Sequence, residues 1–113
     1  MVQVFPKNEL KKGPIADVEF EGAPHGSGVS FFRGKLEAGK DGPPPHSHPY
    51  SETCIVLAGQ VSVTLEGAEV QATAGDVVVI PPGTIHGFRV AGEIPLEMIC
   101  IHASDRFQID WPE

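Results

Sequence analysis

The sequence is short of cysteine, of basic residues and of long apolar runs. Its 113 residues include only two cysteines, Cys54 and Cys100, too few for a disulfide framework, so we expect a reduced, cytoplasmic protein. Eight lysines and arginines oppose fifteen acidic residues, and the formal net charge of −7 argues against nucleic acid and anionic membranes as partners. No apolar run approaches the roughly 18 residues of a membrane helix, and residues 1–7 lack the apolar centre of a signal peptide.

Helical periodicity is also absent over any useful length. Short stretches of Val, Ile and Phe instead lie between thirteen glycines and eleven prolines, a pattern typical of short strands joined by tight turns. We therefore expect an all-β sandwich or barrel of about eight or nine antiparallel strands. The length predicts one domain, residues 1–113, with an N-terminal arm (1–12) that pairs with a sheet edge or a second subunit, and a C-terminal tail (103–113).

Alternation of apolar and polar residues predicts which side chains face the core. Cys54 and Val56 are expected to face inward, and Ile55 and Leu57 outward. Residues 77–80 are apolar on both faces, which predicts a central strand or a strand in an interface.

The same alternation describes the first strands of the chain. Residues 15–20 read as a half-buried strand with Ala16, Val18 and Phe20 on one face. The next strand carries Arg33, which either points into the barrel as an anion-binding group or points outward into solvent.

The most informative stretch is residues 43–52, Pro-Pro-Pro-His-Ser-His-Pro-Tyr-Ser-Glu. In a strand, His46 and His48 share one face about 6.6 Å apart, close enough for both imidazoles to reach one cation. Glu52 has the same parity but lies roughly 13 Å beyond in a straight strand. Pro49 cannot continue a ladder and favours a bend, which would bring Glu52 back toward the histidines.

A second stretch, residues 75–86, runs from a short apolar strand into a Pro-Pro-Gly turn, after which His86 opens the next strand. Together the two stretches resemble the cupin family. The family's first motif (here about 39–59) is matched by its histidines, glutamate and final glycine: His46, His48, Glu52 and Gly59. Gly39, at the start of that motif, lies one residue early. The second motif (about 75–90) is matched by Gly75, Pro81, Gly83 and His86, whereas its final Asn is Val90 here.

The resemblance implies a fold and a cofactor. It implies a double-stranded β-helix, a small jelly roll with its site in the barrel mouth. It also implies one divalent metal bound by the following residues: His46, His48, Glu52 and His86. Three imidazoles and one carboxylate suit a borderline transition metal, namely Fe, Mn, Ni, Co, Cu or Zn.

The resemblance leaves several activities open, because cupins with these ligands include dioxygenases, decarboxylases, isomerases and lyases. We expect a metal-dependent enzyme that acts on a small oxygenated or carboxylated molecule, with dioxygenase-like oxidation as the first choice. Isomerase or lyase chemistry on a sugar acid is an alternative, and so is a binding or sensing module that does not turn its ligand over.

Three further residues are candidates for catalysis. Arg106, after the last strand, is a candidate clamp for a substrate carboxylate, or else a surface ion-pair partner. His102 is a candidate general base, or else a packed strand-end histidine. Tyr50 is a candidate hydrogen-bond donor to the bound molecule, provided that Pro49 rotates it toward the site. Cys54 is either a soft metal ligand or a small core residue.

The tail carries bulky side chains at every second position, Phe107, Ile109 and Trp111, which need an apolar surface to lie on. With the outward Ile55 and Leu57, they favour a homodimer.

Overall fold

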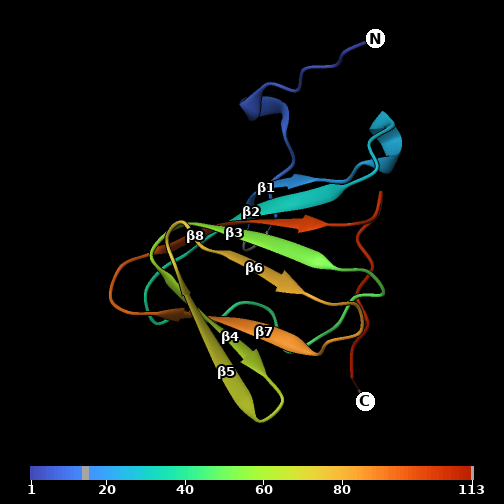
Figure 1. The fold of residues 1–113 in the computed structure, drawn as a ribbon. Helices are drawn as coiled ribbons and strands as arrows, with labels where there is room; N and C mark the ends of the chain where they lie inside the picture. Colours follow the sequence, from blue (N-terminus) through green and yellow to red (C-terminus); the bar gives the residue numbers. More distant parts are fainter. Residues whose placement is uncertain (14–15, 113) are drawn as a thin grey trace.

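The computed structural model describes residues 1–13 and 16–112, which form two facing antiparallel β-sheets (Figure 1). The strands are β1 (Ala16–Phe20), β2 (Ser30–Leu36), β3 (Glu52–Ala58), β4 (Gln60–Leu65), β5 (Ala68–Thr73), β6 (Val77–Ile80), β7 (His86–Ala91) and β8 (Leu96–His102). Two short 3-10 helices, η1 (Lys7–Glu9) and η2 (Ala23–His25), precede β1 and β2. The predicted all-β double-stranded β-helix is confirmed.

The strand order shows how distant segments become neighbours. One sheet has the order β1-β2-β8-β3-β6, and the other has the order β5-β4-β7. Because β8 lies between β2 and β3, the end of the chain sits beside the strand that follows the proline run. This arrangement decides which side chains can meet at the site.

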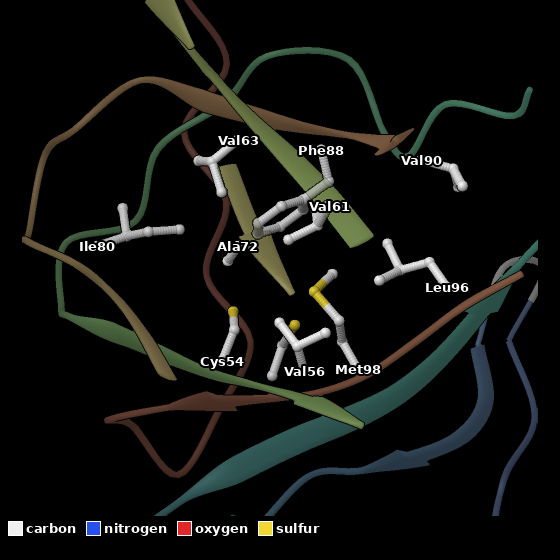
Figure 2. Close-up of a cluster of buried hydrophobic side chains, with 11 residues drawn as sticks. Cys54, Val56, Val61, Val63, Ala72, Ile80, Phe88, Val90, Leu96 and Met98 are labelled. Atoms are coloured by element: carbon white, nitrogen blue, oxygen red, sulfur yellow. The ribbon is translucent and has the colours of Figure 1, made fainter. Parts of the chain in front are cut away.

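The core lies between the two sheets, as Figure 2 shows. Cys54 and Val56 of β3 point into it and are almost fully buried, whereas Leu57 faces out, in agreement with the predicted alternation. The buried cluster is Cys54, Val56, Val61, Val63, Ala72, Ile80, Phe88, Val90, Leu96, Met98 and Cys100. Burial of each larger aliphatic side chain stabilises the fold by about 1.5–3 kcal/mol.

Strand β6 excludes one of its two predicted positions. Among the described residues, 77–80 form an edge strand bonded only to β3, so they are not a central strand, and a role in an interface stays a prediction. Val77 and Val79 are 60% and 62% exposed, while Ile80 is buried. The strand is therefore apolar on both faces, and no other part of the described chain covers its outward face.

Strand β1 corrects another prediction, because its alternation is broken. The register shifts between Ala16 and Val18, which is a β-bulge. Phe20 then pairs with Phe31 of β2, and their rings stack with centroids 5.1 Å apart. Glu19, expected to lie opposite Ala16, joins it in lining the internal cavity described below. Ile15, part of the predicted strand, lies outside the described residues.

The two end segments of the chain pair with the rest of the fold in different ways. The backbone N–H of Glu19 donates to the carbonyl of Lys11, so the N-terminal segment pairs with the edge strand β1 at this point. The C-terminal segment, red in Figure 1, leaves the end of β8 and forms a two-way backbone pair between Asp110 and Ser47. None of the described residues forms a helix long and apolar enough to cross a membrane.

The turn at Gly59 yields a test of the fold. Gly59 has φ +78°, and a Cβ there would lie 2.4 Å from the carbonyl oxygen of Pro95. Gly67 has a similar φ of +75°, but nothing lies within 4 Å of its Cβ position. Urea unfolding should show that Gly67→Ala costs about 1–2 kcal/mol of backbone strain, and that Gly59→Ala costs about 1–3 kcal/mol more because the backbone must move. Equal losses would contradict this placement of the turn.

Candidate metal centre

The two motif segments are joined directly by backbone hydrogen bonds. The N–H of His46 donates to the carbonyl of His86 (3.0 Å), and the N–H of His86 donates to the carbonyl of His46 (2.9 Å). His86 opens β7 of the three-stranded sheet, whereas His46 belongs to the segment that leads into the five-stranded sheet. The pair therefore joins the two segments and holds the two imidazole rings with centroids 4.7 Å apart.

Glu52 is the first residue of β3. The chain bends after Pro49, so the carboxylate returns to the histidines, as the sequence predicts. Its Oε1 lies 3.3 Å from Nε2 of His48 and 3.1 Å from Nε2 of His86. The side chain is only 1% exposed, so these contacts replace water around a buried carboxylate.

The register of β3 and β8 adds a fourth histidine. Glu52 is the cross-strand partner of His102, so the two side chains share a face, and Oε2 of Glu52 lies 3.5 Å from Nε2 of His102. His102 is buried, and its ring centroid lies 4.6 Å from that of His48. The sequence suggested His102 as a general base, but it did not reveal this contact with Glu52.

The other ring nitrogens are fixed by backbone carbonyls. The Nδ1 atoms of His46, His48 and His86 lie 2.8, 2.7 and 2.9 Å from the carbonyls of Pro44, Gln108 and Thr84. A carbonyl only accepts, so each Nδ1 must carry the hydrogen. Each neutral imidazole therefore presents the bare Nε2 lone pair to the site, which is the form that binds a metal.

This tautomer makes the contacts of Glu52 unfavourable unless a positive charge is shared. Carboxylate oxygens and bare Nε2 lone pairs repel one another at 3.1–3.3 Å, so either an extra proton or a metal cation must lie between them. Within the described chain, Nε2 of His48 and Nε2 of His102 are buried without a well-aligned hydrogen bond. A divalent cation fits these unsatisfied atoms and this donor set.

The pKa shifts follow from the same contacts. Burial would raise the pKa of the Glu52 carboxyl, but the imidazoles of His102, His48 and His86, whose Nε2 atoms lie 3.1–3.5 Å from it, hold it well below its usual range. Burial would lower the pKa of His48, but Glu52 and the Gln108 carbonyl raise it. Burial lowers the pKa of His46. Glu52 is therefore an anion at neutral pH and carries the negative charge of the site.

Within the described residues, the donor atoms form three overlapping groups that could each hold a cation. They are His46, His48 and His86; His48, Glu52 and His102; and Glu52, Cys54 and Cys100, and within each group the atoms lie within 4.8 Å of one another. Glu52 contacts members of all three groups. The four predicted ligand residues are thus brought together, and His102 lies beside them.

Cys54 contacts Glu52 as a protonated thiol. Its Sγ donates to Oε2 of Glu52 at 3.7 Å, and the side chain is fully buried. The neighbouring Cys100 thiol and burial both raise the pKa of Cys54. The core-residue interpretation of Cys54 therefore fits its surroundings better than the ligand interpretation, since only a thiolate binds metal well.

Tyr50 connects His102 to the C-terminal segment. Its hydroxyl lies 2.5 Å from Nδ1 of His102 and accepts from the backbone N–H of Gln108 at 3.1 Å. Its ring stacks on His48, with centroids 5.2 Å apart. Tyr50 thus turns toward the cluster, and burial raises the pKa of its phenol.

A cavity of about 430 Å³ adjoins the histidines. His46, His48 and His102 line one part of it, and the tail residues Phe107, Ile109 and Trp111 line another. The sequence predicted that these tail side chains need an apolar surface, and the chain's own cavity supplies part of it, with Ile109 and Trp111 still 46% and 56% exposed. The homodimer stays a prediction.

The two arginines singled out from the sequence do not join the cluster. Arg106 has a mostly exposed side chain that lies 3.6 Å from Asp105, outside the cavity lining. Arg33 faces outward and pairs with Glu97 at 3.7 Å. Of its two predicted positions, the outward one is observed.

Comparisons with known proteins agree with this fold. The Cupin domain family matches residues 32–102. A structure from Klebsiella pneumoniae subsp. pneumoniae, described as an uncharacterized conserved protein with a double-stranded beta-helix domain, matches with a TM-score of 0.77 at 18% identity, over 100% of this chain and 99% of that one. An oxalate oxidase structure matches with a TM-score of 0.71 at 27% identity, over 83% of this chain and 53% of that one.

A curated relative adds sequence similarity over part of the chain. A protein of Methanocaldococcus jannaschii, described as uncharacterized, is 34% identical over 56 residues, or 49% of this chain. The match spans only about half, 45%, of the length of that relative.

Proposed function

Because the chain belongs to the cupin family, we propose that it binds one divalent transition metal and acts as a metal-dependent enzyme on a small oxygenated molecule. The proposed ligands are His46, His48, Glu52 and His86. The observation that carries the proposal is the set of fixed tautomers, in which three carbonyl-anchored imidazoles present bare Nε2 atoms, two of them 3.1–3.3 Å from one buried carboxylate. Fe, Mn, Ni, Co, Cu and Zn all suit such a donor set.

When bound, the metal would supply Lewis acidity or the redox chemistry of O₂ activation. We propose dioxygenase-like oxidation first, and the similarity to an oxalate oxidase structure supports this choice. Isomerase or lyase chemistry and ligand sensing are the alternatives that the experiments below separate. The unpaired, buried thiols of Cys54 and Cys100 suit the reducing cytoplasm that we propose as the location.

The chain itself supplies a proton-transfer group beside the metal ligands. His102 lines the cavity and contacts Glu52, so its Nε2 can take or give a proton at the bound molecule. Tyr50 does not line the cavity; its hydroxyl holds Nδ1 of His102, which makes it a positioning residue. A clamp role for Arg106 stays a prediction, and it needs the side chain to leave Asp105.

Metal titration tests the proposed ligands. The wild-type protein, stripped with a chelator and dialysed against Zn²⁺ or Co²⁺, should retain a single equivalent by elemental analysis. His86→Ala and Glu52→Gln should weaken binding by more than about tenfold, because each removes one donor. His25→Ala is the matched control, since the ring of His25 packs on Phe5 and Phe20 instead of on the histidines of the cluster. Unchanged affinity in both site variants would contradict the ligand assignment.

Oxygen-uptake kinetics test the activity and the role of His102. Fe²⁺-loaded protein should consume O₂ with a member of a panel of enolic and hydroxy-acid compounds. His102→Asn should lower kcat by about a hundredfold or more while keeping its metal, and Tyr50→Phe should lower it less and shift its pH profile. Ile94→Ala, an exposed loop substitution, should leave kcat unchanged.

The same measurements separate the alternatives. Conversion without O₂ consumption would favour isomerase or lyase chemistry. Tight binding of one compound without any turnover would favour the sensing module and contradict the enzymatic proposal. A kcat of His102→Asn equal to that of the wild type would show that His102 does not take part in the reaction.

We also propose a homodimer that pairs through the outer face of the five-stranded sheet. Ile55, Leu57, Val77 and Val79 form an outward apolar surface across β3 and β6, with Val77 and Val79 60% and 62% exposed. Light scattering should show that Val79→Asp is a monomer, because a charge would be buried in the interface. Ile94→Asp, also 60% exposed but in a loop, should remain a dimer. A monomeric wild-type protein would contradict the proposal.

A further inference from the structure

The cavity beside the histidines has walls made almost entirely of hydrocarbon. Strand β2 contributes Phe32 and Leu36, β7 contributes Phe88, and β8 contributes Leu96 and Met98. The C-terminal segment adds Phe107, Ile109 and Trp111. A volume of about 430 Å³ is large for a molecule of only a few atoms.

The histidines lie at one end of this cavity. Along β8, His102 and Leu96 occupy opposite ends, and they pair with Ser30 and Leu36 of β2. Six residue steps of an antiparallel strand correspond to about 20 Å. Because the cavity is lined by both His102 and Leu96, it extends along the strands away from the polar cluster.

The charges around the cavity disfavour an acidic group on the distant part of a ligand. Among the described lining residues there is no lysine or arginine, and Glu19 is the one carboxylate. Arg33, on β2 itself, points to the outer face and pairs with Glu97. A carboxylate among Leu36, Leu96 and Met98 would be desolvated without a partner, which is strongly unfavourable.

The hydrogen-bonding capacity of the cavity is also concentrated at the histidines. A sugar acid needs donors and acceptors along its whole length, and the walls formed by β2, β7 and β8 offer aromatic and aliphatic side chains instead. A flat or chain-like hydrocarbon body matches these walls, because burial of apolar surface stabilises it.

We propose that the site takes an elongated, largely hydrocarbon molecule that carries its oxygen group at one end. The oxygen group lies at His46, His48 and His102, and the apolar body extends toward Leu36 and Leu96. This inference rests on the proposed metal-dependent function and names its substrate class, which excludes sugar acids. Phe107 and Trp111 of the C-terminal segment then act as specificity residues.

Trp111 provides a local signal for the test, because it is the single tryptophan of the chain. Its indole N–H gives one NMR resonance, which reports occupancy of the cavity. The probes are 4-phenylphenol, which has one terminal oxygen, and 4′-hydroxybiphenyl-4-carboxylate, which adds a carboxylate at the far end. D-glucuronate represents the sugar acids. Each is titrated into the metal-free protein and into the Zn²⁺-loaded protein.

We expect 4-phenylphenol to shift the Trp111 resonance and to bind at least about tenfold more tightly than either acid in both forms. Phe107→Ala should weaken its binding by about fivefold or more. Ile109→Ala, at a half-exposed position of the segment that also lines the cavity, should weaken it too and serves as a second variant if the first does not fold. Ile94→Ala is the control and should bind as the wild type does.

Equal or tighter binding of the carboxylate or of D-glucuronate would overturn the inference, as would binding of 4-phenylphenol without a shift of Trp111 or without loss in the tail variants. The outcome for the metal is separate. If the probe pattern holds but Zn²⁺ does not bind, the metal-dependent function fails and the apolar ligand class stands. If Zn²⁺ binds and the probe pattern is reversed, the ligand class alone fails.

Discussion

The site depends on one buried carboxylate, that of Glu52. An ion taken out of water is destabilised by several kcal/mol unless its charge is compensated. The compensation comes from imidazoles of three histidines, and two of these, His48 and His86, have their ring hydrogens committed to backbone carbonyls. With all three imidazoles neutral, lone pairs would face one another. The cluster therefore requires either an extra proton or a metal cation between these atoms, and the donor set suits a divalent metal.

The fold meets this requirement with segments from far apart in the chain. Glu52 and His102 come from neighbouring strands of the large sheet, His86 comes from the small sheet, and the His46–His48 segment joins them. The C-terminal segment contributes a backbone carbonyl, at Gln108, rather than a ligand. Loss of order in that segment would free Nδ1 of His48 and the hydroxyl of Tyr50 together. The last residues of the chain are in this way part of the site's support.

Much of this could be predicted from local pattern, because strand parity and motif spacing are local properties. The inward positions of Cys54 and Val56 and the bend that returns Glu52 followed from them. The edge position of β6, the bulge in β1 and the pairing of Glu52 with His102 did not, since strand order and register arise from contacts between distant segments. The position of the tail could not be predicted for a related reason: its apolar side chains needed an apolar surface, but the sequence did not show that the cavity of the same chain supplies part of it.

In the proposed arrangement, the polar cluster binds the oxygen group of a ligand, which reacts, and the apolar cavity binds its hydrocarbon body, which determines specificity. The central claim beneath this division is that four side chains bind one cation. Crystals of the zinc-loaded protein, measured at the zinc absorption edge, test it most directly. The account predicts one anomalous peak about 2.0–2.2 Å from Nε2 of His46, His48 and His86 and from an oxygen of Glu52. A peak elsewhere, or no peak at full zinc loading, would contradict it.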